Sequence, residues 1–264
     1  MGHVRLGTLP KTRAWKEVIG LIADGADVSS IADATMRAAD KAFEAIQNDK
    51  GFAEAVELMT HLAIAARKDN PADHLDSVGI RLSAQSSIVE VAITINRALD
   101  EKAARNGSRS DFGELAQGAL VGAVVEHLSA RFGTMFAPTS SEIKAALSGL
   151  GKNSEFGKLS STFFSKLTYS AIDYFLSHTI GTQIGEGQRF ATTNQVAQFK
   201  SALDVHCHEA AVIVEKFSGE WFSKNYFQNN GSIPKKKTEG FGWFAMKKMR
   251  EELKQRANTN GSRI

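Results

Sequence analysis

The segment 204–209, with the sequence DVHCHE, holds the densest group of chemically versatile side chains in this 264-residue chain. Imidazole, thiolate and carboxylate groups all bind zinc, so these residue types are typical of a metal site. Successive residues on a helix are about 100° apart, so His206 and His208 point to different sides and cannot bind one ion together. Asp204 and His208 share a side, but these two ligands need others from elsewhere in the chain. We therefore predict neither a metal nor a cofactor, with a metal at Asp204 and His208 as the minor alternative.

The same segment raises the hypothesis of a metal- or thiol-dependent enzyme centred on His206, Cys207, His208 and Glu209. A cysteine beside a histidine can be activated as a thiolate nucleophile. However, apolar residues repeat through the segment at steps of three and four, which is the pattern of a helix packed on other helices. The positions of this repeat are Val196, Phe199, Leu203, His206, Ala210, Ile213 and Phe217. The repeat places His206 in the core with Cys207 beside it as a small apolar side chain, so we predict no catalytic residue here.

A glycine-rich stretch at 181–187, followed by Arg189, raises the possibility of a phosphate site. Phosphate-binding loops rich in glycine follow a strand and open a helix. This stretch joins two expected helices instead, so we interpret it as a flexible connection with Gly181 at the end of the first helix.

Charge is concentrated at the two ends of the chain. Residues 229–264 contain nine Lys or Arg against three Glu, a local charge of +6, whereas the whole chain carries +3. Residues 1–16 contain four Lys or Arg and no acidic residue. Such ends are either solvated termini or the electrostatic footprint of an acidic protein or a nucleic acid. The docking residues that we predict are Arg5, Lys11, Arg13, Lys235, Lys236, Lys237, Trp243, Lys247, Lys248 and Arg250.

The basic C-terminal segment also predicts a final helix at about 240–255. Its spacing turns Trp243 outward, where an indole can fill a partner's pocket or stack on a base, and turns Phe244 inward. No zinc-finger or RNA-recognition motif accompanies it. Our leading hypothesis is a non-enzymatic interaction subunit that docks a protein partner through its basic ends. The first alternative is a nonspecific nucleic-acid-binding protein, and the second is the enzyme described above.

Four prolines at 10, 71, 138 and 234 interrupt long stretches of helical periodicity. They predict an all-α bundle of about 8–10 helices with little or no sheet. We divide the chain into a basic arm (1–11), a helical core (12–228) and a basic C-terminal segment (229–264) whose tail frays beyond Ala257. The core has the sub-blocks 12–70, 71–137 and 138–228.

Three local patterns test this reading. Residues 86–99 combine a helical stripe with a strand-like alternation of β-branched residues, and we favour a helix because the stripe continues to Leu99. Asp111 with Glu114, and Thr139 with Glu142, resemble capping boxes that open helices. Gly118 and Gly122 are four residues apart, which predicts a close helix crossing.

Composition narrows the class of protein further. The chain is 42% hydrophobic and 23% charged, near the averages of globular proteins. Its longest strongly apolar run, 116–125, is half of what a membrane helix needs. A single cysteine fits a reducing compartment, so we predict a cytoplasmic protein without a membrane partner.

Two parts of the chain resemble a family of bacterial all-helical proteins of uncharacterised function. They are the opening VRLGxLPxT at 4–12 with Trp15, and the segment HCxEAA at 206–211 with the aromatic residues of 217–227. The resemblance spans nearly the whole chain. It implies a subunit of a multi-gene bacterial system, such as a phage-defence assembly, and it identifies no catalytic residue.

Overall fold

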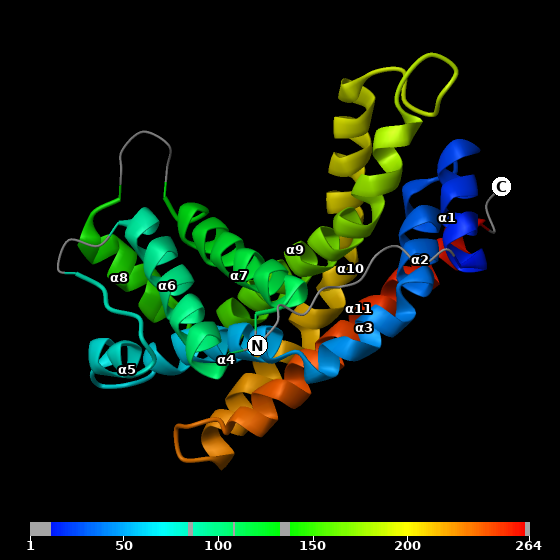
Figure 1. Ribbon diagram of the computed structural model, residues 1–264. Coiled ribbons are helices and arrows are strands. Elements are labelled where there is room, and N and C mark those ends of the chain that lie inside the picture. The colour runs from blue at the N-terminus through cyan, green and yellow to red at the C-terminus, as the bar shows by residue number, and fades with distance from the viewer. Residues whose placement is uncertain (1–11, 84–86, 108, 133–137, 262–264) are drawn as a thin grey trace.

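The computed structural model describes residues 12–83, 87–107, 109–132 and 138–261, and within them the fold is all-α (Figure 1). The only β-type pairing within these described residues is a single bridge between Ile184 and Phe190. The predicted helical class is confirmed. In chain order the elements are α1 (Arg13–Ala23), α2 (Val28–Ala38), α3 (Asp40–Ala45), the 3-10 turn η1 (Ile46–Asn48), α4 (Lys50–Ala65), α5 (Pro71–Ser77), α6 (Ile88–Asn106), α7 (Asp111–Ser129), α8 (Ser140–Gly149), α9 (Asn153–Ile180), the 3-10 turn η2 (Gly181–Gln183), α10 (Thr193–Gln228) and α11 (Lys235–Gly261).

Short polar side chains define where most of these helices begin. Each accepts hydrogen bonds from backbone N–H groups of the first turn, which have no partner within the helix. Thr139 and Glu142 form the predicted capping box of α8. The prediction for α7 is wrong by one residue, because Ser110 caps this helix by accepting from the N–H of Gly113, and Asp111 is its first residue.

Residues 88–106 form helix α6, as favoured above, and not a strand. The β-branched residues that alternate along the sequence fall on two sides of this helix. Val91 and Ile95 are buried, whereas Val89 and Ile93 are exposed. Residues four apart share a helix face, so an alternation of apolar residues along the sequence is also compatible with a helix that has apolar residues on two sides.

Helix α9 makes the most extensive helix–helix contacts of the described structure, first with α10 and then with α7. Figure 1 shows α9 and α10 as an antiparallel hairpin that projects from the body, with α11 running back beside α10 and α2. The shorter helices α4–α8 gather on the other side of the molecule. Large aromatic side chains fill the centre and are fully buried; they are Phe156, Phe163, Phe164 and Phe222.

Glycines do mark close helix contacts, but not the pair that the sequence predicts. A Cβ at Gly118 would meet nothing within 4 Å, and one at Gly122 would meet only the flexible end of Lys166. A Cβ at Gly219 of α10 would instead lie 2.5 Å from the carbonyl oxygen of Asn153 in α9. The predicted crossing at Gly118 and Gly122 is therefore wrong, because spacing alone does not show which side of a helix has a neighbour.

The C-terminal third is more regular than predicted. Helix α10 continues without a break to Gln228, and α11 begins at Lys235 and extends to Gly261, so it starts before the expected residue 240 and passes the expected fraying point. Gly181 has an ordinary helical conformation, and the positive φ angles of the following connection occur at Gly185 (137°) and Gly187 (75°). The connection between α9 and α10 is therefore a turn of defined backbone conformation at the tip of the hairpin (Figure 1).

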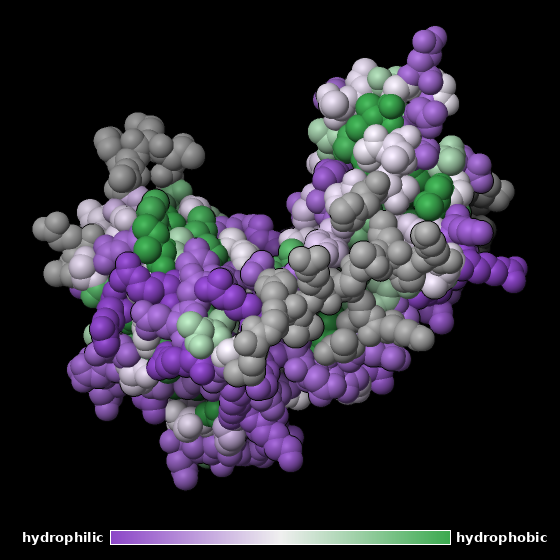
Figure 2. All heavy atoms as spheres, in the orientation of Figure 1, coloured by the Kyte–Doolittle hydropathy of each residue, from purple (hydrophilic) through white to green (hydrophobic). Residues whose placement is uncertain are grey.

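The surface view separates apolar from polar regions. Figure 2 shows hydrophobic side chains gathered near the ends of α6 and α7 and along the α9–α10 hairpin, with hydrophilic side chains around the tip where α10 leads into α11. No described helix has a stretch both long and apolar enough to cross a lipid bilayer.

Candidate functional site

Helix α10 divides the DVHCHE segment between the core and the solvent. Cys207 is fully buried and His206 retains 9% of its exposure, whereas Asp204, His208 and Glu209 are exposed. Glu209 accepts a hydrogen bond from Arg256 of α11 at 2.7 Å. The predicted inward position of His206 is confirmed, and it separates this imidazole from the outward groups.

This division removes the chemistry that the segment suggests. Burial raises the pKa of the Cys207 thiol far above its ordinary value, so the thiol stays protonated and is not nucleophilic. Burial and the nearby Arg256 lower the pKa of His206, and its Nε2 atom has no hydrogen-bond partner in the described structure. The described residues contain no group of three side chains able to hold a metal, so Asp204 and His208 gain no third ligand there.

The glycine-rich connection is occupied by its own contacts. The N–H of Gly185 donates to the carbonyl of Phe190 at 2.9 Å, and the N–H of Phe190 donates to the carbonyl of Gln183 at 3.0 Å. The guanidinium of Arg189 lies 5.5 Å from the centre of the Phe190 ring. These groups close a compact turn instead of pointing together at a phosphate.

The predicted docking residues of α11 fall into two groups. Three of them form ion pairs within the molecule: Lys235 with Glu57 (3.7 Å), Lys248 with Glu251 (2.6 Å), and Arg250 with Asp40. Lys236, Lys237 and Lys247 are exposed and form no salt bridge with an acidic residue in the described part of the chain. Lys247 is nevertheless close enough to Glu251 to help Lys248 lower the pKa of that carboxyl.

The exposed residues extend along one side of α11. We define the outer seam as Lys236, Gly240, Trp243, Lys247 and Lys254, all of which are exposed. Trp243 keeps 38% of its surface, and the Nζ atom of Lys247 lies 5.6 Å from the centre of its ring. That contact is a cation–π interaction, which orders both side chains at the middle of the seam.

The remaining predicted residues lie elsewhere. Arg13 is exposed at the start of α1, and Arg5 and Lys11 lie outside the described residues. Phe244 was expected to point inward, and this is wrong: it is 41% exposed and packs edge-on against Phe217, with ring centres 5.1 Å apart. The helical spacing did not reveal this exposure, because Phe244 lies at the edge of the buried side of α11.

Sequence reasoning missed Gly240 and did not include Lys254 among the docking residues. Placing the final helix at 240–255 made Gly240 a helix start, whereas in the structure it lies inside α11. A helical projection begun at Lys235 would have found both residues, because 236, 240, 243, 247 and 254 share one side at helical spacing.

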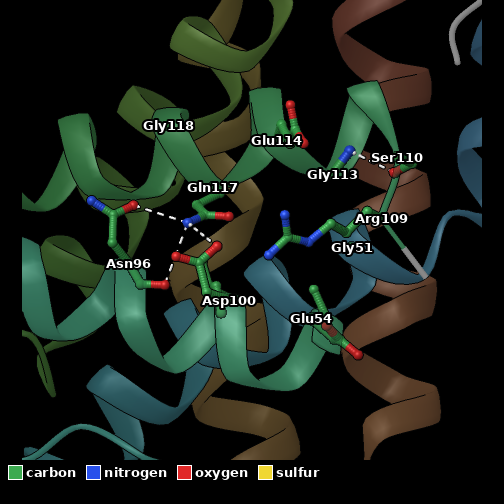
Figure 3. Close-up of a pocket in the computed structure, with 12 residues that line it drawn as sticks. Gly51, Glu54, Asn96, Asp100, Arg109, Ser110, Gly113, Glu114, Gln117 and Gly118 are labelled. Carbon is green, nitrogen blue, oxygen red and sulfur yellow. Dashed lines mark hydrogen bonds between the residues drawn. The ribbon is translucent and has the colours of Figure 1, made fainter. Parts of the chain in front are cut away.

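A second candidate is a polar pocket of about 340 Å³ between α4, α6 and α7. Figure 3 shows the guanidinium of Arg109 pointing into it, above Gly51 and near Gly113. The side-chain amide of Gln117 donates toward Asn96 and Asp100 at 3.1–3.3 Å on the opposite wall.

The pocket has the composition of a helix junction more than of a reaction centre. A Cβ at Gly51 would lie 2.7 Å from the Cα of Gly113, so the glycines allow α4 and α7 to meet there. Among the described lining residues the one hydroxyl group is Ser110 Oγ, which accepts the N–H of Gly113 at 2.9 Å as a helix cap. Among the described lining residues there is no histidine or cysteine to pair with it as a base or nucleophile.

Comparisons of the chain with protein-family models, with curated proteins and with solved structures find no match. The resemblance noted from the sequence therefore stays a prediction, and the function must be argued from the site.

Proposed function

We propose that this protein is a non-enzymatic interaction subunit that docks a protein partner through the outer seam of α11. One observation carries the proposal: Lys236, Lys247 and Lys254 are exposed, form no salt bridge with a described acidic residue, and stand in line with the exposed Trp243. Tryptophan is among the residues that most often dominate the energy of an interface. Lysines that form no salt bridge within the protein accelerate its association with an acidic surface and disfavour its association with a basic surface.

The opposite side of α11 supports the proposal because it fixes the seam in place. Phe241, Ala245, Met249 and Leu253 are buried in the core, and the ring of Phe241 stacks on Trp221 with centres 4.1 Å apart. A rigid helix loses little conformational entropy when its outer side is bound. The seam is therefore organised before any partner arrives.

Nonspecific nucleic-acid binding is the second candidate function, because the same lysines and Trp243 offer phosphate and base contacts. It predicts affinity that falls steeply with salt. The cytoplasmic location and the bacterial assembly, such as a phage-defence system, are predictions from the sequence and its resemblance alone.

The test is site-specific photo-cross-linking in the cells that make the protein. A photoreactive residue replaces Glu239, which is exposed next to the seam. We expect a discrete cross-linked protein whose yield falls by about tenfold or more when Lys236, Lys247 and Lys254 are changed to Glu.

The matched control reverses three other exposed lysines without acidic partners in the described structure: Lys16, Lys144 and Lys152. It should leave the cross-link intact. The proposal is wrong if position 239 gives no discrete product, or if the control triple variant loses the product as fully as the seam variant.

A further inference from the structure

We infer that the outer seam binds a helix of the partner that carries acidic side chains at three- and four-residue spacing. This inference rests on the proposed function and names the chemistry of the partner. Three features carry it: the spacing of the seam, the open position at Gly240, and the charge left unpaired.

The spacing of the seam suits a helix. From Lys236 the seam advances by four residues to Gly240, three to Trp243 and four to Lys247, which is eleven residues in three steps and an average near 3.7. This is close to the 3.6 residues of one helical turn, so these positions lie in a line along the helix on which a second helix can pack. From Lys236 to Lys254 that line is about 27 Å long.

Packing within the described molecule does not require a glycine at position 240. It is exposed, and a Cβ there would meet nothing within 4 Å. Its neighbour Gly242 differs, because a Cβ there would lie 3.0 Å from both Phe52 and Val56 of α4. A glycine within a helix costs about 1 kcal/mol relative to alanine, so an exposed one without a neighbour destabilises the helix for no gain in its own fold.

The missing side chain at Gly240 makes a hollow between its neighbours on the seam. The positions three and four residues away, which border it on the helix surface, are Lys236, Lys237, Trp243 and Phe244. Packing of helices inserts a side chain of one into such a hollow of the other, and glycine lets the two backbones approach closely. The hollow thus gives the seam a shape that a helix fills.

Charge defines the chemistry of the bound helix. Lys236, Lys247 and Lys254 bring three positive charges that form no salt bridge with a described acidic residue, while Glu251 beside them is bound by Lys248 at 2.6 Å and has its pKa lowered by Lys248 and, more weakly, by Lys247. Acidic side chains on the face that the partner helix turns toward the seam can pair with these lysines and set its orientation.

A nucleic-acid chain fits these features less well. Proteins that bind single strands use a positive groove that follows the backbone. The seam is the convex side of one helix, its lysines are about 16 and 10 Å apart along the axis, and the exposed Glu239 borders it. Phosphates are much more closely spaced than that.

The experiment maps the product cross-linked from position 239. Mass spectrometry identifies the cross-linked segment of the partner, and we expect a helix with Asp or Glu at three- and four-residue intervals. Changing those acids to Lys should restore the yield of the K236E/K247E/K254E variant to within about threefold of the original, because the charge pairs are re-formed with reversed sign.

A second variant tests the hollow. Gly240→Leu fills it without a clash inside the chain, so the melting temperature should stay the same or rise, while the cross-link yield falls by about tenfold. Gly240→Ala is the milder matched change and should give a smaller loss.

The outcomes separate the two claims. If position 239 yields no discrete product, or a product that nuclease destroys, the proposed docking of a protein fails. If a protein product forms but maps to an extended or non-acidic segment, or survives Gly240→Leu, the docking surface stands and the acidic helix is wrong. A labelled 20-nucleotide single-stranded DNA that displaces the mapped partner segment at physiological salt would also contradict the inference.

Discussion

Two regions of this protein that are rich in reactive or charged side chains differ in how the fold exposes them. The DVHCHE segment of α10 has the residue types of a catalyst, yet its thiol and one imidazole are buried and its polar groups point away from them. The basic stretch of α11 has the residue types of a solvated helix, yet it presents an exposed tryptophan in line with lysines that form no salt bridge with the described acidic residues. The difference lies in phase: each helix has one apolar side, and the position of a residue relative to that side decides what it can do.

This comparison also separates the two sides of α11. Phe241 is 3% exposed and contacts four other aromatic rings, whereas Trp243, two residues later, is 38% exposed. The inner side holds the fold together and the outer side is available for binding. The predictions below test whether residues divide between these two roles as the structure places them.

The largest effect is expected from Phe241→Ala, which should lower the free energy of unfolding by about 3–5 kcal/mol because it leaves a cavity in the aromatic core. Trp243→Ala should cost less than about 1 kcal/mol. Urea denaturation of both variants checks this. Equal losses would mean that the two sides of α11 are not distinct.

Gly219→Ala should destabilise by about 3 kcal/mol, because the added Cβ meets the carbonyl oxygen of Asn153. Gly240→Ala, the outward glycine, should stabilise by up to about 1 kcal/mol. Thermal melts of the two proteins measure the contrast. A stable Gly219→Ala protein would contradict the close contact of α9 with α10.

Acidic pH should lower the free energy of unfolding, because it favours protonation of histidines that are buried in the folded state. Burial, and then the ring of His74, lower the pKa of His61 from 6.5 to about 4, and burial also lowers the pKa of His206. The folded state therefore binds fewer protons than the unfolded state between these values. Stability present above pH 6.5 should be lost as the pH falls toward 4, by about 2–3 kcal/mol for His61.

Urea denaturation at pH 7.5, 5.5 and 4.5 measures this loss, and His61→Gln is the control that should flatten the dependence. The nitrogen atoms of His61 and His74 are 3.1 Å apart, so a proton on both would oppose their contact. A free energy of unfolding that stays constant from pH 7.5 to 4.5 would show that these rings are not held neutral.

The smallest effect distinguishes the two imidazoles of α10. His206→Ala should cost about 1–2 kcal/mol through lost packing, and His208→Ala, at an exposed position, less than about 0.5 kcal/mol. Chemical denaturation of both variants beside the parent protein gives the comparison. A His206→Ala protein as stable as the parent would remove His206 from the core.

The sequence was sufficient for the helical class, for the helix at 88–106 and for the inward position of His206, because apolar periodicity reports burial directly. It failed at Gly118 and Gly122, since spacing does not tell which neighbour faces a helix. It placed Phe244 inward because this residue lies at the edge of the buried side of α11. It passed over Gly240 because the start of α11 was set five residues too late. It also could not separate Lys236 and Lys247 from Lys235 and Arg250, whose acidic partners Glu57 and Asp40 are distant in the chain.

The central claim is that binding resides in the outer seam and not in the DVHCHE segment. The most direct test compares two triple variants, K236E/K247E/K254E and D204A/H208A/E209A, by the yield of the partner cross-linked from position 239. We predict that the first variant loses the partner by about tenfold or more and that the second retains it. The opposite pattern, with binding lost from the α10 variant and kept by the seam variant, would contradict the account.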